Sequence, residues 1–317
     1  MTTICFLLAI AVSVADHDSL LKSEVHPLDN GTMQVWAKPA DLAIWVKQRQ
    51  SAPLLVHFHG RAEVVADAFA RSGAEQMLVV VNFPGLSSAY RSPVERDPQL
   101  LSQILKIATN ELTRWERSIL AQTQAEASEL ALPVPIVREH GLTLSSFSAG
   151  YGAVRELLKS SDNFSRIDNL FLADSLYASL AQDDRPVDNP GTMPRLVFPD
   201  HMREFLTFAE AAVAGKKHFA ISHSAQTTPY ASTTETADYL LTQLHVQREN
   251  VTSNAMVGDD EPHCTSRAHA GQFIVLGYDG TSGQEHMWHL YHIERLWSAF
   301  QATPSRTPSG TSKDALP

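Results

Sequence analysis

Residues Gly141–Leu158, GLTLSSFSAGYGAVRELL, decide how the rest of the chain is interpreted. A short apolar run, Leu142–Leu144, is followed by small residues and then by apolar residues at helical spacing. This pattern predicts a strand, a tight turn and a helix, with Ser148 at the apex of the turn. The N-terminus of the helix would face Ser148 with free backbone N–H groups, which favour a developing negative charge.

The turn reads S-x-S-x-G, whereas the usual nucleophile turn reads G-x-S-x-G. Ser146 and Gly150 stand two positions before and after Ser148, and serine is small enough to replace the first glycine. The motif is short enough to arise by chance, so a purely structural Ser148 remains an alternative on this stretch alone.

Two further stretches support the catalytic interpretation. LLVHFHG lies at 54–60 and FIVLGYDGTSGQEHMWHL at 273–290, on either side of the Ser148 turn. Together the three stretches resemble the α/β-hydrolase superfamily over roughly residues 50 to 300. The resemblance implies an α/β fold, with a mostly parallel central sheet flanked by helices and a possible small cap over about 176–215. It also implies the chain order Ser…Asp/Glu…His for a catalytic triad.

A serine hydroxyl needs a base that takes its proton, and an acid that orients the base. Asp174 directly follows the apolar run Leu170–Ala173, which is predicted to be a strand. In open α/β sheets, functional groups gather at the carboxyl ends of the strands. We therefore expect Asp174 to be the acid and His286, just after a glycine-containing loop, to be the base. His289 is the alternative base and His292 a weaker one. The alternative acids are Asp200, Asp259, Asp260 and Glu261.

The resemblance also implies an oxyanion hole. Its donors would be the backbone N–H of Ala149 and one N–H near Gly60 or Arg61. Further residues expected near the substrate come from the end of the predicted strand at 54–60 and from the loop 82–93. They are His59, Tyr90 and Arg91.

A metal site is the main chemical alternative. His57 and His59 alternate on a strand, and three histidines follow residue 285 at a spacing of three, a grouping that can hold zinc. The HExxH pattern is absent, and we expect neither a metal nor another cofactor. The expected activity is that of a secreted serine hydrolase acting on a small-molecule ester. A peptidase or amidase on the same fold, and a non-catalytic binding protein, remain alternatives.

Composition sets the broader limits. The 317 residues are 44% hydrophobic, which allows one domain with a large core, expected at 16–302. The net charge is −10 and no basic cluster occurs, which argues against nucleic acid as a partner.

Residues 1–15 resemble a signal peptide cleaved before Asp16, with an apolar core too short for a stable membrane span. Cys264 would then have no disulfide partner. A secreted or periplasmic location is expected, with a disordered tail at 303–317.

Overall fold

The computed structural model describes residues 17–122, 137–181, 195–251 and 261–300. The expected signal peptide and C-terminal tail lie outside the described residues, as do Asp259 and Asp260. The strands are β1 (Leu21–Lys22), β2 (His26–Leu28), β3 (Gly31–Ala37), β4 (Leu54–Phe58), β5 (Met77–Asn82), β6 (Leu142–Phe147), β7 (Ile167–Ala173), β8 (His218–His223), β9 (Glu249–Asn250), β10 (Cys264–Ala270) and β11 (Phe273–Tyr278). The helices are η1 (His17–Ser19), α1 (Pro39–Gln48), α2 (Ala62–Arg71), α3 (Ser87–Arg96), α4 (Leu100–Gln122), η2 (Ser148–Gly150), α5 (Tyr151–Leu158), α6 (Ser161–Arg166), η4 (Pro199–His201), α7 (Arg203–Val213), α8 (Thr233–Gln243), α9 (Gly283–Tyr291) and α10 (Ile293–Trp297).

The strands form one 11-stranded sheet in the order β1-β3-β5-β4-β6-β7-β8-β11-β10-β9, with β2 paired to β3. The central run from β5 to β11 is parallel, and antiparallel strands close both edges. Parallel strands end at the same edge of a sheet, so the residues after β4, β6 and β7 lie close together. The sheet is mostly parallel and flanked by helices, which confirms the predicted fold class.

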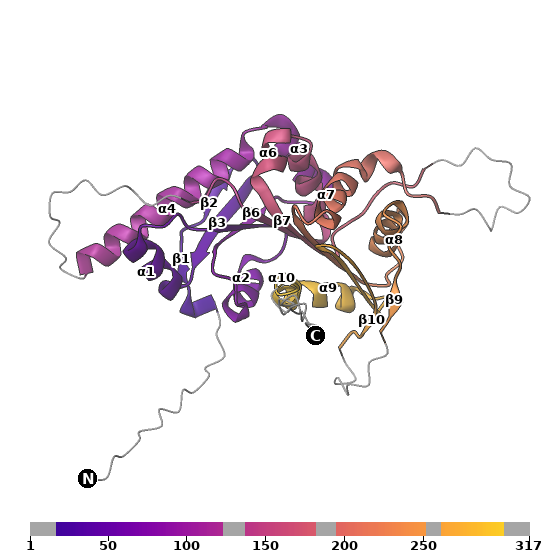
Figure 1. Ribbon diagram of the computed structural model, residues 1–317. Helices are drawn as coiled ribbons and strands as arrows, with labels where there is room; N and C mark the ends of the chain where they lie inside the picture. The colour runs from indigo at the N-terminus through magenta and orange to yellow at the C-terminus, as the bar shows by residue number, and fades with distance from the viewer. Residues whose placement is uncertain (1–16, 123–136, 182–194, 252–260, 301–317) are drawn as a thin grey trace, which may run out of the picture.

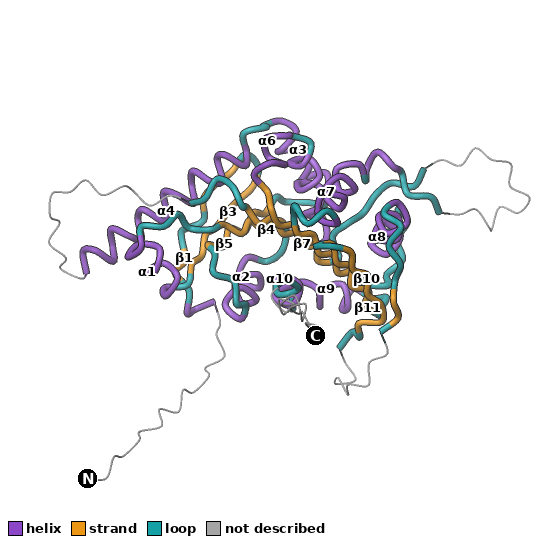
Figure 2. Tube along the Cα trace, viewed as in Figure 1, coloured by secondary structure: helices purple, strands orange, loops and turns teal. Residues whose placement is uncertain are grey.

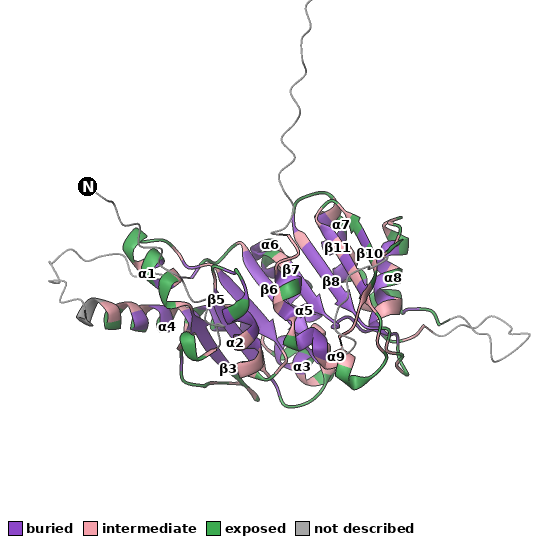
Figure 3. Cartoon of the chain, turned by 90° about the horizontal axis from the view of Figure 1, so that it is seen from below, coloured by how far each residue is buried: buried purple, intermediate pink, exposed green. Residues whose placement is uncertain are grey.

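Helices cover both faces of the sheet. Figure 1 shows α4, α6 and α7 above the sheet and α2, α9 and α10 below it, and Figure 2 shows the strands running between these two layers. Successive side chains of a strand point to opposite faces, so each central strand supplies both cores. On β4, for example, Leu54, Val56 and Phe58 enter one core and Leu55 enters the other. The strands are accordingly buried while the outer faces of the helices are exposed (Figure 3).

One local expectation differs from the structure. The stretch 82–93 is predicted as a loop, but α3 begins at Ser87 and continues through Pro93. Tertiary packing explains this difference, because α3 lies so close to α5 that a Cβ on Gly152 would sit 2.3 Å from the Ser87 carbonyl oxygen. After β11 the chain forms two helices, α9 and α10, separated at His292.

The possible cap at 176–215 is described only in part. Its helical part is α7, whose buried side chains belong to the core on one face of the sheet. This helix therefore belongs to the covering layer. Residues 182–194 of the same stretch lie outside the described residues.

Among the helices that the structure describes, none has the length and apolar character needed to cross a membrane.

Candidate active site

The turn after β6 holds Ser148 in a strained conformation. Ser148 has a φ of 46°, which is uncommon for a residue other than glycine. The turn is tight because a Cβ on Gly150 would lie 2.2 Å from the Phe58 carbonyl oxygen, so only glycine fits there. Ser148 remains partly exposed at the mouth of a cavity, and α5 starts three residues later.

Ser146, which replaces the first glycine of the usual motif, braces this turn. It is fully buried, and its Oγ lies 2.7 Å from the Oγ of Ser175. The Ser175 hydroxyl donates to the Ser148 carbonyl oxygen over 2.8 Å. Ser146 therefore does more than avoid a clash, because its hydroxyl completes a chain of hydrogen bonds that ends on the strained turn.

Asp174 follows β7 directly and is fully buried, with a φ of 42°. Its carboxylate accepts hydrogen bonds from the backbone N–H of Ser224 (3.0 Å), the Ser224 hydroxyl (2.8 Å) and the Thr233 hydroxyl (2.5 Å). The Nδ1 of His286 lies 2.7 Å from Oδ2. Burial pushes the pKa of Asp174 up, but the hydrogen bonds from His286 and Thr233 outweigh it and hold that pKa well below its usual range. Asp174 is therefore ionised at neutral pH.

His286 lies in the first turn of α9. Ser282 caps this helix and forms a capping box with Glu285, which fixes the helix start directly before His286. The ring stacks on Phe147, with centroids 4.6 Å apart. An ionised carboxylate only accepts, so Nδ1 carries the proton donated to Asp174 and Nε2 is left as an acceptor.

No hydrogen bond joins the Ser148 hydroxyl to the His286 ring within the described segments 137–181 and 261–300. Such contacts are often long in ligand-free enzymes and tighten when substrate binds.

The other candidate histidines and acids lie elsewhere. His289 is buried, with Nδ1 2.9 Å from the Ser222 Oγ, and burial lowers its pKa to about 4. His292 ends α9. Asp200 pairs with Arg203, and Glu261 lies 3.3 Å from Arg295. Asp174 and His286 are thus the acid and histidine that the structure brings together.

The loop after β4 follows the strand that pairs with β6. The N–H of Gly60 donates to the Asn82 Oδ1 over 3.2 Å, and the Asn82 amide donates back to the Gly60 carbonyl over 2.9 Å. Gly60 has a φ of 138°, which favours glycine. The Gly60 N–H is therefore already occupied by the Asn82 side chain. Asn82 is not among the site residues predicted from the sequence. The signal for it is that a polar residue stands at the end of the apolar strand β5.

His59 and Tyr90 connect this loop to Asn82 through hydrogen bonds. The Nδ1 of His59 lies 2.9 Å from the Tyr90 hydroxyl, which donates to the Asn82 Oδ1 over 3.2 Å. Burial, together with a smaller effect of the nearby His286, lowers the pKa of His59 to about 4. Tyr90 is buried away from the cavity at Ser148, whereas Arg91 lines that cavity.

His57 is fully buried, and both ring nitrogens are occupied. Nδ1 lies 3.0 Å from the Ser145 Oγ, and Nε2 lies 2.8 Å from the His59 carbonyl oxygen. Within the described residues, no group of three or more His, Cys, Asp or Glu side chains is placed to hold a metal ion.

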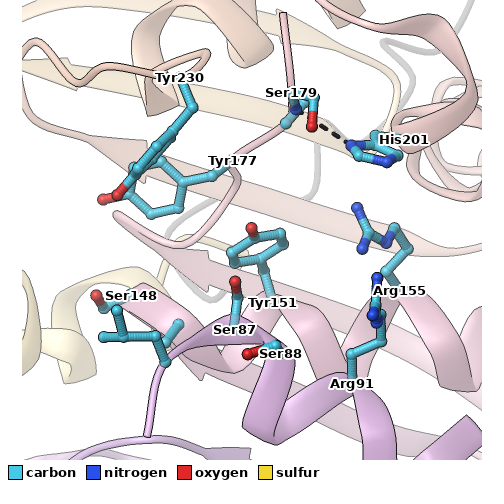
Figure 4. Close-up of a pocket in the computed structure, with 13 residues that line it drawn as sticks. Ser87, Ser88, Arg91, Ser148, Tyr151, Arg155, Tyr177, Ser179, His201 and Tyr230 are labelled. Carbon is cyan, nitrogen blue, oxygen red and sulfur yellow. Dashed lines mark hydrogen bonds between the residues drawn. The ribbon is translucent and has the colours of Figure 1, made fainter.

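Ser148 and Ala149 form one end of a cavity of about 330 Å³. Figure 4 shows Tyr177 and Tyr230 on the same side as Ser148, Tyr151 between Ser148 and the arginines, and Arg91 and Arg155 at the end away from Ser148. Tyr177 packs against both other tyrosines, with ring centroids 5.6 and 5.5 Å away. A substrate carbonyl at Ser148 would therefore have a space lined by aromatic side chains beside it.

The buried histidines should make the folded protein sensitive to acid. Burial lowers the pKa of His57 to about 3 and that of His289 to about 4. As the pH falls from about 6.5 toward these values, the unfolded chain binds protons that the folded chain does not, so stability is lost. In urea titrations we expect the free energy of unfolding to fall by up to about 1.4 kcal/mol per pH unit for each histidine. The slope should flatten in His289→Gln but not in His269→Gln, whose side chain is exposed. An unaltered slope in His289→Gln would contradict this account.

Comparisons with known proteins found similar structures only. No protein-family model and no curated protein matches the chain. Among solved structures, a ferulic acid esterase is 10% identical, with 87% of this chain and 95% of that chain covered and a TM-score of 0.44. Carboxyl esterase 2 from the mycorrhizal fungus Tuber melanosporum is 14% identical, with 86% and 78% covered and a TM-score of 0.40. A haloalkane dehalogenase loop variant from Bradyrhizobium elkanii is 8% identical, with 89% and 96% covered and a TM-score of 0.38.

Similarity at these identities and TM-scores assigns no substrate to this chain. The fold follows from the order and direction of the strands and from the sharp turn after β6. By these features, the chain has the α/β-hydrolase fold.

Proposed function

We propose that this protein is a serine hydrolase that cleaves carboxylic esters, with Ser148 as nucleophile, His286 as base and Asp174 as the acid that orients it. The observation that carries the proposal is the 2.7 Å contact between the His286 Nδ1 and a fully buried, ionised Asp174, at the sheet edge where Ser148 sits in its strained turn.

The reaction begins when the Ser148 oxygen attacks the substrate carbonyl carbon and the His286 Nε2 takes the hydroxyl proton. Asp174 holds Nδ1–H and stabilises the resulting imidazolium. The N–H groups of Ala149 and Arg61 stabilise the negative oxygen of the tetrahedral intermediate. The intermediate then collapses, the C–O bond to the alcohol breaks, and His286 returns the proton to the leaving oxygen. Water, activated by the same histidine, releases the acid.

Cleavage of an amide would use the same residues, so peptidase activity is the alternative within this mechanism. A panel of p-nitrophenyl esters and aminoacyl p-nitroanilides separates the two. We expect turnover of short-chain esters with kcat/KM well above that of the anilides, and loss of both in Ser148→Ala. Anilide cleavage exceeding ester cleavage would favour the peptidase, and Ser148-independent turnover would remove the proposal altogether.

We further propose that the enzyme is exported. The support is the sequence of residues 1–15, whose apolar run ends in Ser13-Val14-Ala15, with small residues at the positions that a signal peptidase reads. N-terminal sequencing of protein recovered outside the cytoplasm should begin at Asp16. Exported protein that retains Met1 would contradict the cleavage, and Ala15→Gln should block it.

A further inference from the structure

The cavity at Ser148 has a positively charged far end. In Figure 4, Arg91 and Arg155 lie together on the side away from Ser148, with His201 beside them. They come from three separate elements, α3, α5 and η4. The fold thus collects three groups that can donate hydrogen bonds at one end of a cavity whose other end is the proposed nucleophile.

Arg155 is the best-defined of the three. Its residue is only 8% exposed, and its nearest carboxylate is Glu156, 3.5 Å from Nε. Glu156 is shared with Lys159, 2.6 Å away. Within the described residues, the Arg155 guanidinium makes no hydrogen bond that would satisfy its remaining N–H groups. A guanidinium has five such donors, and the Arg155 nitrogens that make no hydrogen bond are accessible to the cavity rather than sealed from it. Because Arg155 lines the cavity, these donors can be satisfied by what the cavity binds.

Arg91 and His201 reinforce this end. Arg91 is exposed, and its one ion pair among the described residues is with Glu95 on its own helix at 3.3 Å. Such an exposed pair has a small energetic value, so a ligand can replace it. The Nδ1 of His201 accepts from the Ser179 N–H over 3.1 Å, which leaves its Nε2 as a donor.

The charge at this end is positive. Burial lowers the pKa of His201, and the positive charges of Arg155, Arg91 and Lys159 lower it further. Asp200 acts in the opposite direction but pairs with Arg203. Arginine recognises planar oxyanions such as carboxylates by paired hydrogen bonds.

We propose that the ester substrate carries a negatively charged group, of which a carboxylate is the simplest, and that Arg155 and Arg91 bind this group while the ester carbonyl lies at Ser148. This inference rests on the proposed hydrolase function. Tyr151, which lies between the two ends, provides an aromatic face and a hydroxyl for the part of the substrate that joins the carbonyl to the charge. The charge lies on either the acyl part or the alcohol part of the ester, and the test below separates the two.

Two pairs of matched esters provide the test. In the first, p-nitrophenyl hydrogen adipate is compared with p-nitrophenyl methyl adipate, so that the acyl part differs only by the charge. In the second, the butyrate ester of p-hydroxybenzoate is compared with the butyrate ester of methyl p-hydroxybenzoate, which places the charge on the alcohol part. We expect the wild type to prefer the charged member of one pair by about tenfold or more in kcat/KM, as hydrogen bonds to a charged group imply.

Arginine variants show where the preference arises. The ratio of kcat/KM for charged and neutral esters should fall about tenfold in Arg155→Gln and in Arg91→Gln. Arg91→Gln changes an exposed side chain and should fold normally. The kcat/KM ratio can therefore be measured in this variant even if Arg155→Gln folds poorly. Arg96→Gln is the matched control, because Arg96 lies on the same helix but pairs with Asp29 at 3.0 Å. It should keep the wild-type ratio.

Two failures can be told apart. If Ser148-dependent hydrolysis of the neutral esters persists but neither pair shows a preference that depends on Arg91 or Arg155, the anion site is wrong and the hydrolase stands. If no ester is turned over, the hydrolase proposal fails, and equilibrium dialysis with monomethyl adipate and dimethyl adipate decides the anion site. Tighter binding of the monoanion by the wild type than by Arg155→Gln and Arg91→Gln would support it, and equal binding would overturn it.

Discussion

Replacing Ser148 by alanine is expected to lower kcat for the best ester substrate by about four to six orders of magnitude, because no other group in the cavity would act as the nucleophile. The folded structure should be retained. Within the described residues, the Ser148 hydroxyl makes no hydrogen bond, and the bond that braces the turn ends on the backbone carbonyl of Ser148. Alanine also has no greater difficulty than serine with the φ of 46°. The melting temperature should therefore stay within about 2 °C of the wild type.

Ser165→Ala is the matched control, since Ser165 is an exposed serine on α6 that lies outside the cavity. It should keep wild-type turnover. Both variants are assayed at equal concentrations of folded protein, established by circular dichroism. Wild-type turnover in Ser148→Ala would make Ser148 a structural residue and end the proposed mechanism.

The second large effect concerns the base. His286→Ala should lower kcat by about four orders of magnitude or more, close to the loss in Ser148→Ala, because residues that act as a unit lose their effect together. His289→Ala should keep turnover within about tenfold of the wild type. It should be less stable by about 1–3 kcal/mol, because it opens a cavity and leaves the Ser222 hydroxyl without its partner.

Turnover and unfolding free energy have to be measured together for these two variants. The double variant Ser148→Ala/His286→Ala should lose little more than either single change, which tests whether the two residues act as a unit. Loss of turnover in His289→Ala at unchanged stability, with an active His286→Ala, would move the base by one helical turn.

The sequence contains enough information for the main strands and for the residues proposed as the triad. The runs Leu54–Val56 on β4, Met77–Val81 on β5 and Leu170–Ala173 on β7 are apolar on both faces, as in buried parallel strands. Asp174 could be chosen because the end of such a strand is a defined place in this kind of sheet. His286 could be chosen because a glycine-containing loop comes directly before it.

The parts that could not be predicted depend on contacts between distant segments. The helix α3 contains Pro93 and several serines, and its formation follows from packing against Gly152 on α5. The strand β10 was not predicted, because its alternating exposed residues reflect an antiparallel edge next to β11.

The supporting residues of the site follow the same rule. Ser175, Ser224 and Thr233 hold Ser148 and Asp174 by hydrogen bonds across 27, 50 and 59 positions of the chain. Serine and threonine are common in turns, so nothing in their local sequence distinguishes them from ordinary loop residues. Only the folded arrangement of β7, β8 and α8 shows what they contact.

The central claim is that Ser148 is a nucleophile activated by His286 and Asp174. Its most direct test is reaction of the protein with a fluorophosphonate, followed by mass spectrometry of the digested chain. Such a reagent modifies a serine only where a base and an oxyanion hole activate it. The account predicts one phosphonylated peptide, which contains Ser148, and at least a hundredfold slower labelling in His286→Ala with undiminished labelling of Ser148 in His289→Ala. No labelling of Ser148 in the folded wild type, or labelling at an equal rate without His286, would contradict it.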